Sequence, residues 1–445
     1  MLYPTPYPYQ DTYARDLSQR DRVLFSGDMG IGKTCISITA ANLASCSTVL
    51  IICPASLITN WERELSPDMW MLLANVTVIS YNKVTQPKHF DRLRRIAWDV
   101  VICDEAHYLK NHTSKRARAV YAAGGIASKA KRLWLLSGTF TPNNASELWT
   151  HLQAVAPDKV SRSFYNFRNH YCLVAESAIP GRNRDGSRRK STKILGNRNV
   201  AELNQLLAPL TIRCKAKDVL PDLPPLQFNK VFVDAQDALG VTEEMKAFSQ
   251  HAKDMSWLMA QMIKYLEEGD VEAARDLEKE LNLEHLARAL RYLSVLKAGA
   301  AVDFVKELLN STEKVVVIGK HRQALELISK GLDSSKISTV KVDGSTSMKK
   351  RSRWIDEFQR SEDPKVFIGQ VNACGVGITL TRANHVVFAE QSWVPADNIQ
   401  AAKRCHRIGQ DRTVFVHVLT IPNSLDEIVQ SVLILKQSMI NQYNL

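Results

Sequence analysis

The features that would assign this chain to a membrane or to a secretory pathway are missing. No apolar run in its 445 residues approaches the roughly 20 residues that a membrane-spanning helix needs. The first ten residues, MLYPTPYPYQ, have neither the basic start nor the apolar core of a secretory signal. We therefore expect no membrane partner, and a location in the cytoplasm of a bacterium or a viral host cell, or in the nucleus if the source is eukaryotic.

The sequence also lacks the cysteine patterns of a metal-binding module or a disulfide framework. Its eight cysteines form no C-x-x-C pair and show no other metal-ligand spacing. Several lie inside apolar segments, so we expect reduced, mostly buried thiols that bind no metal. The cysteines are Cys35, Cys46, Cys53, Cys103, Cys172, Cys214, Cys374 and Cys405.

An excess of basic residues is present but does not identify a partner by itself. The chain has 58 Lys and Arg against 46 Asp and Glu, which gives a formal net charge of +12. This balance suits a polyanion, although many basic proteins bind no nucleic acid. A length of 445 residues exceeds one ordinary core, so we expect two α/β domains with modest insertions.

A glycine-rich phosphate-binding signature follows the first apolar run. Residues 23–26 are strand-like, and residues 27–34 read G-x-x-x-x-G-K-T and open a helix-compatible stretch. In that order, backbone N–H groups and the helix dipole attract phosphate, whereas a chance match in a glycine-containing loop is the alternative. Lys33 is expected to reach the β- and γ-phosphates of ATP, and the Thr34 hydroxyl to bind Mg²⁺. The predicted ATP-binding residues of this segment are Asp28, Met29, Gly30, Ile31, Gly32, Lys33, Thr34 and Cys35.

A pair of acidic residues ends another apolar segment, in the sequence DVVICDEAH. Acids at the end of a buried parallel strand point into the crevice where open α/β sheets bind ligands. We expect Asp104 to hold Mg²⁺ and Glu105 to orient and deprotonate the attacking water. His107 is expected to couple this site to a neighbouring segment, with a merely packed histidine as the alternative.

The repeated alternation of strand-like and helix-compatible segments predicts two parallel sheets, each covered by helices on both faces. The expected strands of the first half are residues 23–27, 49–54, 76–81, 99–104 and 133–138. Those of the second half are residues 315–319, 338–344, 365–370, 385–390 and 414–420, before a C-terminal helix from about Leu425. Three prolines in residues 219–225 exclude a continuous helix and mark a connection between the lobes.

Two further segments differ from this rhythm. Residues 181–198 are rich in Arg, Lys, Gly and Ser, and we expect a mobile loop that lies on DNA phosphates, with a solvated loop as the alternative. Its candidate DNA-binding residues are Arg182, Arg184, Arg188, Arg189 and Lys190. Residues 242–309 predict a helical protrusion with one buried stripe, with a coiled-coil partner surface as the alternative. The basic cluster at Lys110, Lys115, Arg116 and Arg118 is a second DNA-binding candidate or an exposed helix face.

Several motifs in a fixed order resemble the SWI/SNF-type DNA translocases of helicase superfamily two. They are the DEAH box with its continuation YLKNHTSKRARA, the segments VLIICPASLITNWEREL and LWLLSGTFTPNNASELW, and the end segment SWVPADNIQAAKRCHRIGQ. The resemblance extends from about Tyr7 to Lys436. FYNFRNHYC and GNRNVAELNQLL are similar to the compact annealing-helicase-like branch.

This resemblance implies two RecA-like lobes in tandem with helical insertions and an ATP cleft between them. Lobe 1 is expected at 1–225, with a helical and basic-loop insertion at about 150–215. Lobe 2 is expected at 226–445, with the helical protrusion at about 242–309 and an arginine motif at 400–410.

The resemblance also assigns roles by position. It implies that Gln10 recognises adenine and that Gly377 approaches the nucleotide. Ser137, Gly138 and Thr139 match the segment that links hydrolysis to DNA contact. Arg404 and Arg407 match arginines that face the γ-phosphate, where guanidinium supplies charge to the transition state. Backbone groups of further residues are implied DNA contacts, with ordinary strand-end residues as the alternative: Ser80, Tyr81, Gly319, Lys320, Asn372 and Ala373.

Some positions depart from the family pattern without removing a catalytic group. They are Gly27 in place of an acid, Phe140 in place of a proline, Cys214 in place of an arginine, and Ala402 and Lys403 in place of acids. These departures weaken the inference of coupling to DNA more than that of ATP binding.

Three classes of function are compatible with these observations. The favoured class is an ATP-dependent translocase on double-stranded DNA, including forked or branched DNA, that acts without sequence preference. The second is a strand-separating helicase or an RNA remodeler of the same superfamily. The third is a non-catalytic DNA-binding recruitment module, against which the intact catalytic residues argue. We expect a monomer, with targeting either supplied by a protein partner or absent.

Overall fold

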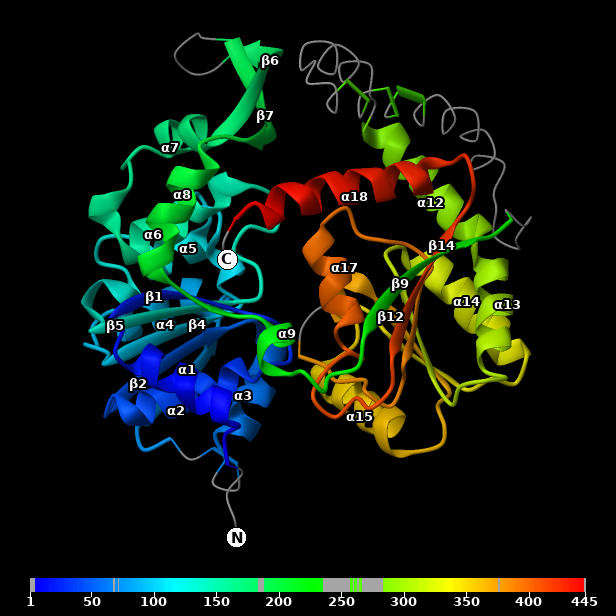
Figure 1. The fold of residues 1–445 in the computed structure, drawn as a ribbon, viewed down its shortest axis with the longest axis horizontal. Coiled ribbons are helices and arrows are strands. Elements are labelled where there is room, and N and C mark those ends of the chain that lie inside the picture. The colour runs from blue at the N-terminus through cyan, green and yellow to red at the C-terminus, as the bar shows by residue number, and fades with distance from the viewer. Residues whose placement is uncertain are drawn as a thin grey trace. The chain divides into compact units, whose positions relative to one another are not determined.

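The computed structural model describes residues 5–66, 69–70, 72–182, 188–234, 257–258, 260–261, 264–265, 283–374 and 377–443. The chain forms two compact units, which Figure 1 shows in blue to green and in green to red. Unit 1 comprises Met1–Val174, Thr192–Asp222 and Ser438–Leu445, and unit 2 comprises Ala175–Ser191 and Leu223–Gln437. We call them the first lobe and the second lobe.

The first lobe is built on a six-stranded parallel sheet in the order β3-β2-β4-β5-β1-β8. Its strands are β1 (Arg22–Gly27), β2 (Thr48–Cys53), β3 (Asn75–Ser80), β4 (Val100–Asp104), β5 (Arg132–Ser137) and β8 (Thr211–Cys214). The five strands predicted from apolar runs are confirmed within one residue at each end. Strand β4 is buried at every position, as expected for a parallel strand with helices on both faces.

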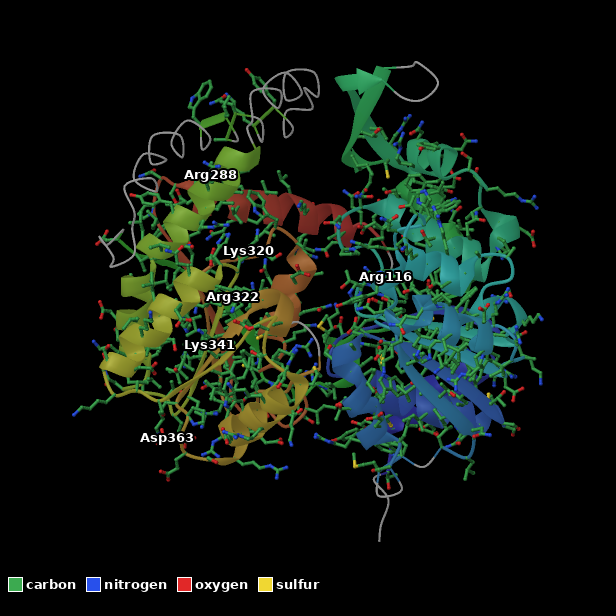
Figure 2. The ribbon with its side chains drawn as sticks, turned by 180° about the vertical axis from the view of Figure 1, so that it is seen from behind. Arg116, Arg288, Lys320, Arg322, Lys341 and Asp363 are labelled. Atoms are coloured by element: carbon green, nitrogen blue, oxygen red, sulfur yellow. The ribbon has the colours of Figure 1, made fainter. Side chains whose placement is uncertain are left out.

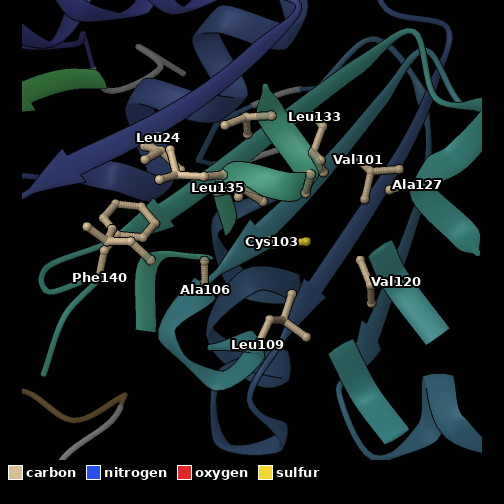
Figure 3. Packing of buried hydrophobic residues seen from close by; sticks show 14 of the residues in the cluster. Leu24, Val101, Cys103, Ala106, Leu109, Val120, Ala127, Leu133, Leu135 and Phe140 are labelled. Carbon is tan, nitrogen blue, oxygen red and sulfur yellow. The ribbon is translucent and has the colours of Figure 1, made fainter. Parts of the chain in front are cut away.

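Helices connect and cover these strands (Figure 1). Those of the first lobe are α1 (Pro8–Ser18), α2 (Lys33–Leu43), α3 (Ile58–Glu64), α4 (Pro87–Leu93), α5 (Lys115–Tyr121), α6 (Leu148–Val155), α7 (Phe164–Tyr171), α8 (Val200–Leu207) and α9 (Ala216–Val219). Figure 3 shows the core on one face of the sheet, where Leu24, Val101 and Leu135 from three strands meet Leu109 and Val120. This packing fixes the carboxyl ends of β1, β4 and β5, which carry the candidate site.

The second lobe repeats the architecture with the strand order β11-β12-β10-β13-β14-β9. Its strands are β9 (Leu226–Phe232), β10 (Val315–Gly319), β11 (Thr339–Val342), β12 (Val366–Gln370), β13 (His385–Phe388) and β14 (Val414–Thr420), all paired in parallel. Its helices are α12 (Leu283–Leu296), α13 (Ala298–Leu308), α14 (Arg322–Ser334), α15 (Met348–Arg360), α16 (Val371–Cys374), α17 (Pro395–Ala402) and α18 (Leu425–Asn441). The predicted fold class of two parallel-sheet α/β lobes of the RecA type is therefore confirmed.

The prediction of a loop at residues 181–198 is wrong. The chain forms two paired strands here, β6 (Cys172–Arg182) and β7 (Arg188–Asn197). A two-stranded ribbon does not have to bury both faces, so it can form from a segment rich in charged residues, and charge density alone did not reveal this. Arg184 lies outside the described residues, as do the side chains of Arg182, Arg188, Arg189 and Lys190.

The expected helical protrusion at 242–309 is described only in part. Helices α12 and α13 occupy its end, and most of residues 235–282 lie outside the described residues. All eight cysteines are free and buried, which confirms the expectation of mostly buried thiols. None of the helices in the described ranges is long and apolar enough to cross a membrane.

Candidate functional site

The loop between β1 and α2 requires glycine at two positions. Gly30 and Gly32 have φ values of 87° and 80°, in the left-handed region that L side chains rarely adopt. Gly32 precedes the first residue of α2, and a Cβ placed on it would lie 2.3 Å from Gln10 Nε2. The glycines therefore allow the chain to turn tightly from the strand into the helix, with the start of α2 above the loop.

The side chain of Lys33 lies back along this loop. Its Nζ donates to the carbonyl oxygens of Gly27 at 3.0 Å and Asp28 at 3.2 Å. The carboxylate of Asp28 points elsewhere and accepts from the backbone N–H of Ala216 at 2.9 Å. The Asp28 side chain thus holds the loop against α9, and its predicted contact with ATP would have to come from its backbone.

Gln10 is fixed against the same loop from helix α1. Its Nε2 donates to the carbonyl of Ile31 at 3.1 Å, and its Oε1 accepts from the backbone N–H of Tyr7 at 3.0 Å. The thiol of Cys35 is 3.5 Å from the same Oε1. The sequence-predicted residues Gln10, Ile31 and Cys35 therefore lie together, and Gln10 is buried while Tyr7 is half exposed.

Asp104 is the buried acid at the end of β4. Its Oδ2 accepts from Trp61 Nε1 at 2.9 Å, and its Oδ1 accepts from the backbone N–H of Glu105 at 2.9 Å. Burial and the neighbouring Glu105 carboxyl raise the pKa of Asp104 to about 6, while the charge of Lys33 and the Trp61 hydrogen bond act in the opposite direction. A buried carboxyl close to a second acid and to the phosphate-binding loop fits a divalent cation, so the site is compatible with Mg²⁺ held by Thr34 and Asp104.

Glu105 has a backbone conformation that is rare for a residue with a side chain. Its φ and ψ are 50° and 52°, and its side chain is buried. The left-handed turn brings Glu105 Oε2 to 3.3 Å from His107 Nδ1. This conformation sets the direction of the carboxylate and ties it to the histidine two residues later.

His107 in turn contacts the segment after β5. Its Nδ1 lies 3.3 Å from Ser137 Oγ, which donates to the Thr139 carbonyl at 2.9 Å and accepts from the Thr139 N–H at 3.1 Å. A Cβ on Gly138 would lie 3.2 Å from Met29 Cε in the phosphate-binding loop. The structure therefore brings together all four residues predicted to couple the site.

The two candidate arginines belong to the second lobe and follow α17. The Arg404 side chain is buried, with Nη1 3.5 Å from the Ile378 carbonyl. Arg407 is partly exposed, and its Nη1 donates to Thr379 Oγ1 at 3.1 Å. Both hold the segment that begins at Gly377, whose φ of 78° favours glycine. Their predicted role at a γ-phosphate stays a prediction.

The side chains at the predicted DNA contacts are mostly engaged within their own lobes. Ser80 and Tyr81 are buried, and Lys110 forms an ion pair with Glu147 at 2.6 Å. The carbonyl of Ala373 accepts from Arg351. The side chain of Asn372 lies outside the described residues. Gly319 ends β10, where a Cβ would lie 2.8 Å from Leu325 Cδ2, and Lys320 follows it.

Two supporting residues were not recognised from the sequence as part of this site. Trp61 contacts Asp104 as described, and the Tyr81 hydroxyl donates to the Asp104 carbonyl at 2.8 Å. The Tyr81 ring stacks on Tyr108, over which Arg116 (labelled in Figure 2) lies at 5.4 Å. A buried Trp or Tyr usually has a hydrogen-bond partner. A Trp or Tyr in a segment expected to be buried could therefore have indicated a polar contact from the sequence.

Comparison with known proteins places this geometry in a family. Residues 67–291 match the SNF2-related domain, and residues 300–409 match the helicase conserved C-terminal domain. The chain is 29% identical over 449 residues to the DNA annealing helicase and endonuclease ZRANB3 of Mus musculus, covering 96% of this chain and 39% of that protein. It is 30% identical over 429 residues to the SWI/SNF-related matrix-associated actin-dependent regulator of chromatin subfamily A-like protein 1 of Xenopus laevis, covering 92% and 41%.

The chain thus spans about two fifths of the length of these relatives. Among solved structures, the Sulfolobus solfataricus SWI2/SNF2 ATPase core in complex with dsDNA matches with a TM-score of 0.41 and 21% identity, covering 98% of this chain and 92% of that one. Because the SNF2-related match alone extends over half of the sequence and the helicase C-terminal match follows it, the chain belongs to the SNF2-related family.

Proposed function

We propose that this chain is an ATP-dependent translocase on double-stranded DNA that remodels DNA or protein–DNA complexes without sequence preference. The observation that carries the proposal is the continuous contact from Asp104 and Glu105 through His107 to Ser137 and Thr139. It joins the acids that would hold Mg²⁺ and activate water to the segment that would sense DNA. A site built only to bind a nucleotide would not require this connection.

Within the first lobe, each residue has a defined task in this proposal. The loop after β1 cradles phosphate with backbone N–H groups, and Lys33 leaves the Gly27 and Asp28 carbonyls to reach the β- and γ-phosphates. Glu105 orients the attacking water and accepts its proton. Bound Mg²⁺ would supply charge neutralisation between the phosphate oxygens, with Thr34 and Asp104 as its protein ligands.

The second lobe would complete the site. Arg404 and Arg407 would supply positive charge to the transition state, and loss of the γ-phosphate would remove the attraction that holds the lobes closed. Alternating closure and reopening would move DNA by one step per cycle, through contacts with phosphate and sugar. The partner DNA would be duplex, including forked or branched forms, in line with the name annealing helicase of the ZRANB3 relative.

Strand separation is the second candidate function. The name of the same relative includes the word helicase, and tests of unwinding and of translocation need different substrates. Displacement of a third strand from a triplex reports translocation along an intact duplex. Release of one strand from a partial duplex reports unwinding.

The decisive experiment measures ATP turnover in parallel with duplex DNA, branched DNA, single-stranded DNA and RNA, together with triplex displacement. We expect stimulation by duplex and branched DNA, with triplex displacement that depends on ATP. The Lys33→Ala variant should lose both signals. Stimulation by RNA alone, or no stimulation by any nucleic acid, would overturn the proposal.

A further inference from the structure

The turn after β10 is held by the ends of three neighbouring strands. It consists of Lys320, His321 and Arg322, the last of which opens α14. Gln370, at the end of β12, donates from Nε2 to the Lys320 carbonyl at 2.9 Å. Asp343, just after β11, pairs with Arg322 at 3.1 Å. Each strand end therefore fixes a different residue of the turn.

The strongest of these contacts comes from Glu390, two residues after the end of β13. Its Oε2 accepts from the backbone N–H groups of Lys320 at 3.1 Å and His321 at 2.9 Å. Its Oε1 lies 2.5 Å from His321 Nδ1, and the carboxylate is only 9% exposed. Both N–H groups come just before the first residue of α14, whose N-cap is His321, so neither has a partner within the helix and this carboxylate satisfies them.

The ionised state of Glu390 is favoured by these contacts. Burial alone would raise its pKa, but the hydrogen bonds and charge of His321 outweigh burial and lower the pKa of Glu390 below its ordinary value. The side chain is therefore an anion at neutral pH. It can accept from both backbone donors and from the imidazole at the same time.

The amine of Lys320 is left available by this arrangement. In the described part of the chain, its Nζ makes no hydrogen bond or ion pair, whereas the neighbouring Arg322 is paired with Asp343. Figure 2 labels both residues in the second lobe. The backbone on either side of Lys320 is fixed by Glu390 and Gln370, so its side chain leaves from a constrained position.

Glu390 also begins the segment that leads to the arginine pair. Ser392 donates from its backbone N–H to Asn398 Oδ1 at 2.7 Å, and its hydroxyl contacts Asp397 at 2.8 Å. These bonds tie residues 390–398 to α17, after which Arg404 and Arg407 follow. One short, well-bonded stretch thus connects the turn at Lys320 to the predicted γ-phosphate contacts within the same lobe.

We propose that Glu390 is a positioning residue for DNA engagement, which fixes the backbone of Lys320 so that its amine meets a DNA phosphate. This inference rests on the proposed function. Glu390 itself does not contact DNA and acts through Lys320. Its effect should therefore disappear when the Lys320 amine is absent.

The test uses Glu390→Gln in the full chain. The amide keeps the volume of the side chain but replaces one acceptor by a donor that faces backbone N–H groups. We expect the DNA concentration for half-maximal ATP turnover to rise about tenfold, with maximal turnover at saturating DNA within about twofold of the parent. The slope of log affinity against log salt should become shallower by about 0.9, the loss of one phosphate contact.

A double-mutant cycle separates positioning from general loosening of the lobe. Lys320→Ala should produce the same loss of affinity, and adding Glu390→Gln to Lys320→Ala should change it no further. Glu313→Gln is the matched control because it removes a carboxylate that pairs with Arg382 at 3.0 Å on the same lobe, away from the turn. In this control, the DNA concentration for half-maximal ATP turnover and the slope of log affinity against log salt should equal those of the parent.

The possible results distinguish a failure of the positioning role from a failure of the proposed function. Additive losses in the double variant, or a parental salt slope in Glu390→Gln, would overturn the positioning role while the DNA stimulation of the parent protein keeps the proposed function intact. A parent protein that DNA does not stimulate would overturn the proposed function, and this inference with it.

Discussion

The indole N–H of Trp61 donates to the carboxylate of Asp104 at 2.9 Å, although the two residues lie on different elements of the first lobe. Trp61 lies on α3 and is fully buried, and Asp104 ends β4. A charge-assisted hydrogen bond in a buried site is worth roughly 1.5–3 kcal/mol. It opposes the burial that raises the pKa of Asp104 and therefore favours the ionised form that a cation needs.

Trp61→Phe should lower ATP turnover about tenfold at neutral pH and raise the pKa of Asp104 above its present value of about 6. Because the carboxylate must be ionised to hold Mg²⁺, the acidic limb of the pH profile should move to higher pH. The control is Trp98→Phe, which loses an indole hydrogen bond to the Leu93 carbonyl at 3.0 Å elsewhere in the lobe. If the acidic limb of the pH profile did not move in Trp61→Phe, Trp61 would have no role in keeping Asp104 ionised.

Glu105→Gln should bind ATP but hydrolyse it about 10³-fold more slowly, because the amide cannot accept the proton of water. Binding of a fluorescent ATP analogue and single-turnover hydrolysis measure the two steps. Lys131→Ala, which breaks a surface pair with Asp99 at 2.7 Å, serves as the control for the lobe. Equal loss of binding and hydrolysis would remove Glu105 from the role of general base.

Arg407→Ala should slow hydrolysis by about 10³-fold or more at saturating ATP, since a transition-state charge would be missing. Arg353→Ala is a suitable control because Arg353 is exposed and pairs with Glu357 on α15 at 3.0 Å. Single-turnover hydrolysis with bound DNA gives the rate of the chemical step. Parental turnover in Arg407→Ala would contradict the proposed role of Arg407 at the γ-phosphate.

His107→Ala should reduce DNA-stimulated turnover more strongly than DNA-independent turnover, because it breaks the contact between Glu105 and Ser137. The ratio of the two rates, measured with and without duplex DNA, is the informative quantity. His89→Ala gives the comparison for a histidine outside the site. An equal reduction of both rates would make His107 part of the hydrolytic chemistry instead of the coupling.

The sequence was sufficient for the central strands, because parallel strands that are covered on both faces are continuous apolar runs such as VLIIC and VVVIG. The edge strands β8 and β9 were not predicted. Five of the seven residues of β9, Gln227–Lys230 and Phe232, are exposed, since an edge strand needs apolar cover on fewer sides. A rule based on apolar runs cannot recognise such a strand.

The candidate site likewise has some features that a single segment of the sequence predicts and others that it does not. Local motifs placed Lys33 at the start of a helix and Asp104 at the end of a strand, because the residues that define each motif are adjacent in sequence. The contacts of Trp61 with Asp104 and of Glu390 with Lys320 join residues that are 43 and 70 positions apart. Such pairs depend on how helices and strands pack, and no spacing within a single segment encodes them.

The basic hairpin formed by β6 and β7 offers a test of DNA contact that does not depend on the ATP site. Replacing Arg188, Arg189 and Lys190 with serine should weaken DNA stimulation and make the salt dependence shallower by up to about 3, if each cation neutralises one phosphate. Replacing the exposed cations Lys88, Lys129 and Lys131 of the first lobe is the matched control for net charge. If the slope of log affinity against log salt did not change, the three cations of the hairpin would be solvated and would make no contact with DNA phosphates.

Acid should destabilise both lobes through histidines that are buried in the neutral form. Burial, and then the charge of His107 and Lys110, lowers the pKa of His151 to about 3, while burial and then His385 lower the pKa of His417 to about 4. The His417 ring stacks on His385 with an interplanar angle of 3° and a nitrogen separation of 3.0 Å, so protonating both rings would remove their hydrogen bond and add repulsion.

Because these folded-state pKa values lie below the unfolded value of about 6.5, the stability that each neutral histidine contributes is present above pH 6.5 and is lost as the pH falls toward 4 and 3. Each histidine should make the free energy of unfolding fall more steeply with decreasing pH, by up to about 1.4 kcal/mol per pH unit. Urea unfolding at pH 7, 6 and 5 measures this decline. The His417→Gln variant should show a shallower decline than the parent, whereas His89→Gln should follow the parent, and equal declines in all three would contradict the burial of a neutral His417.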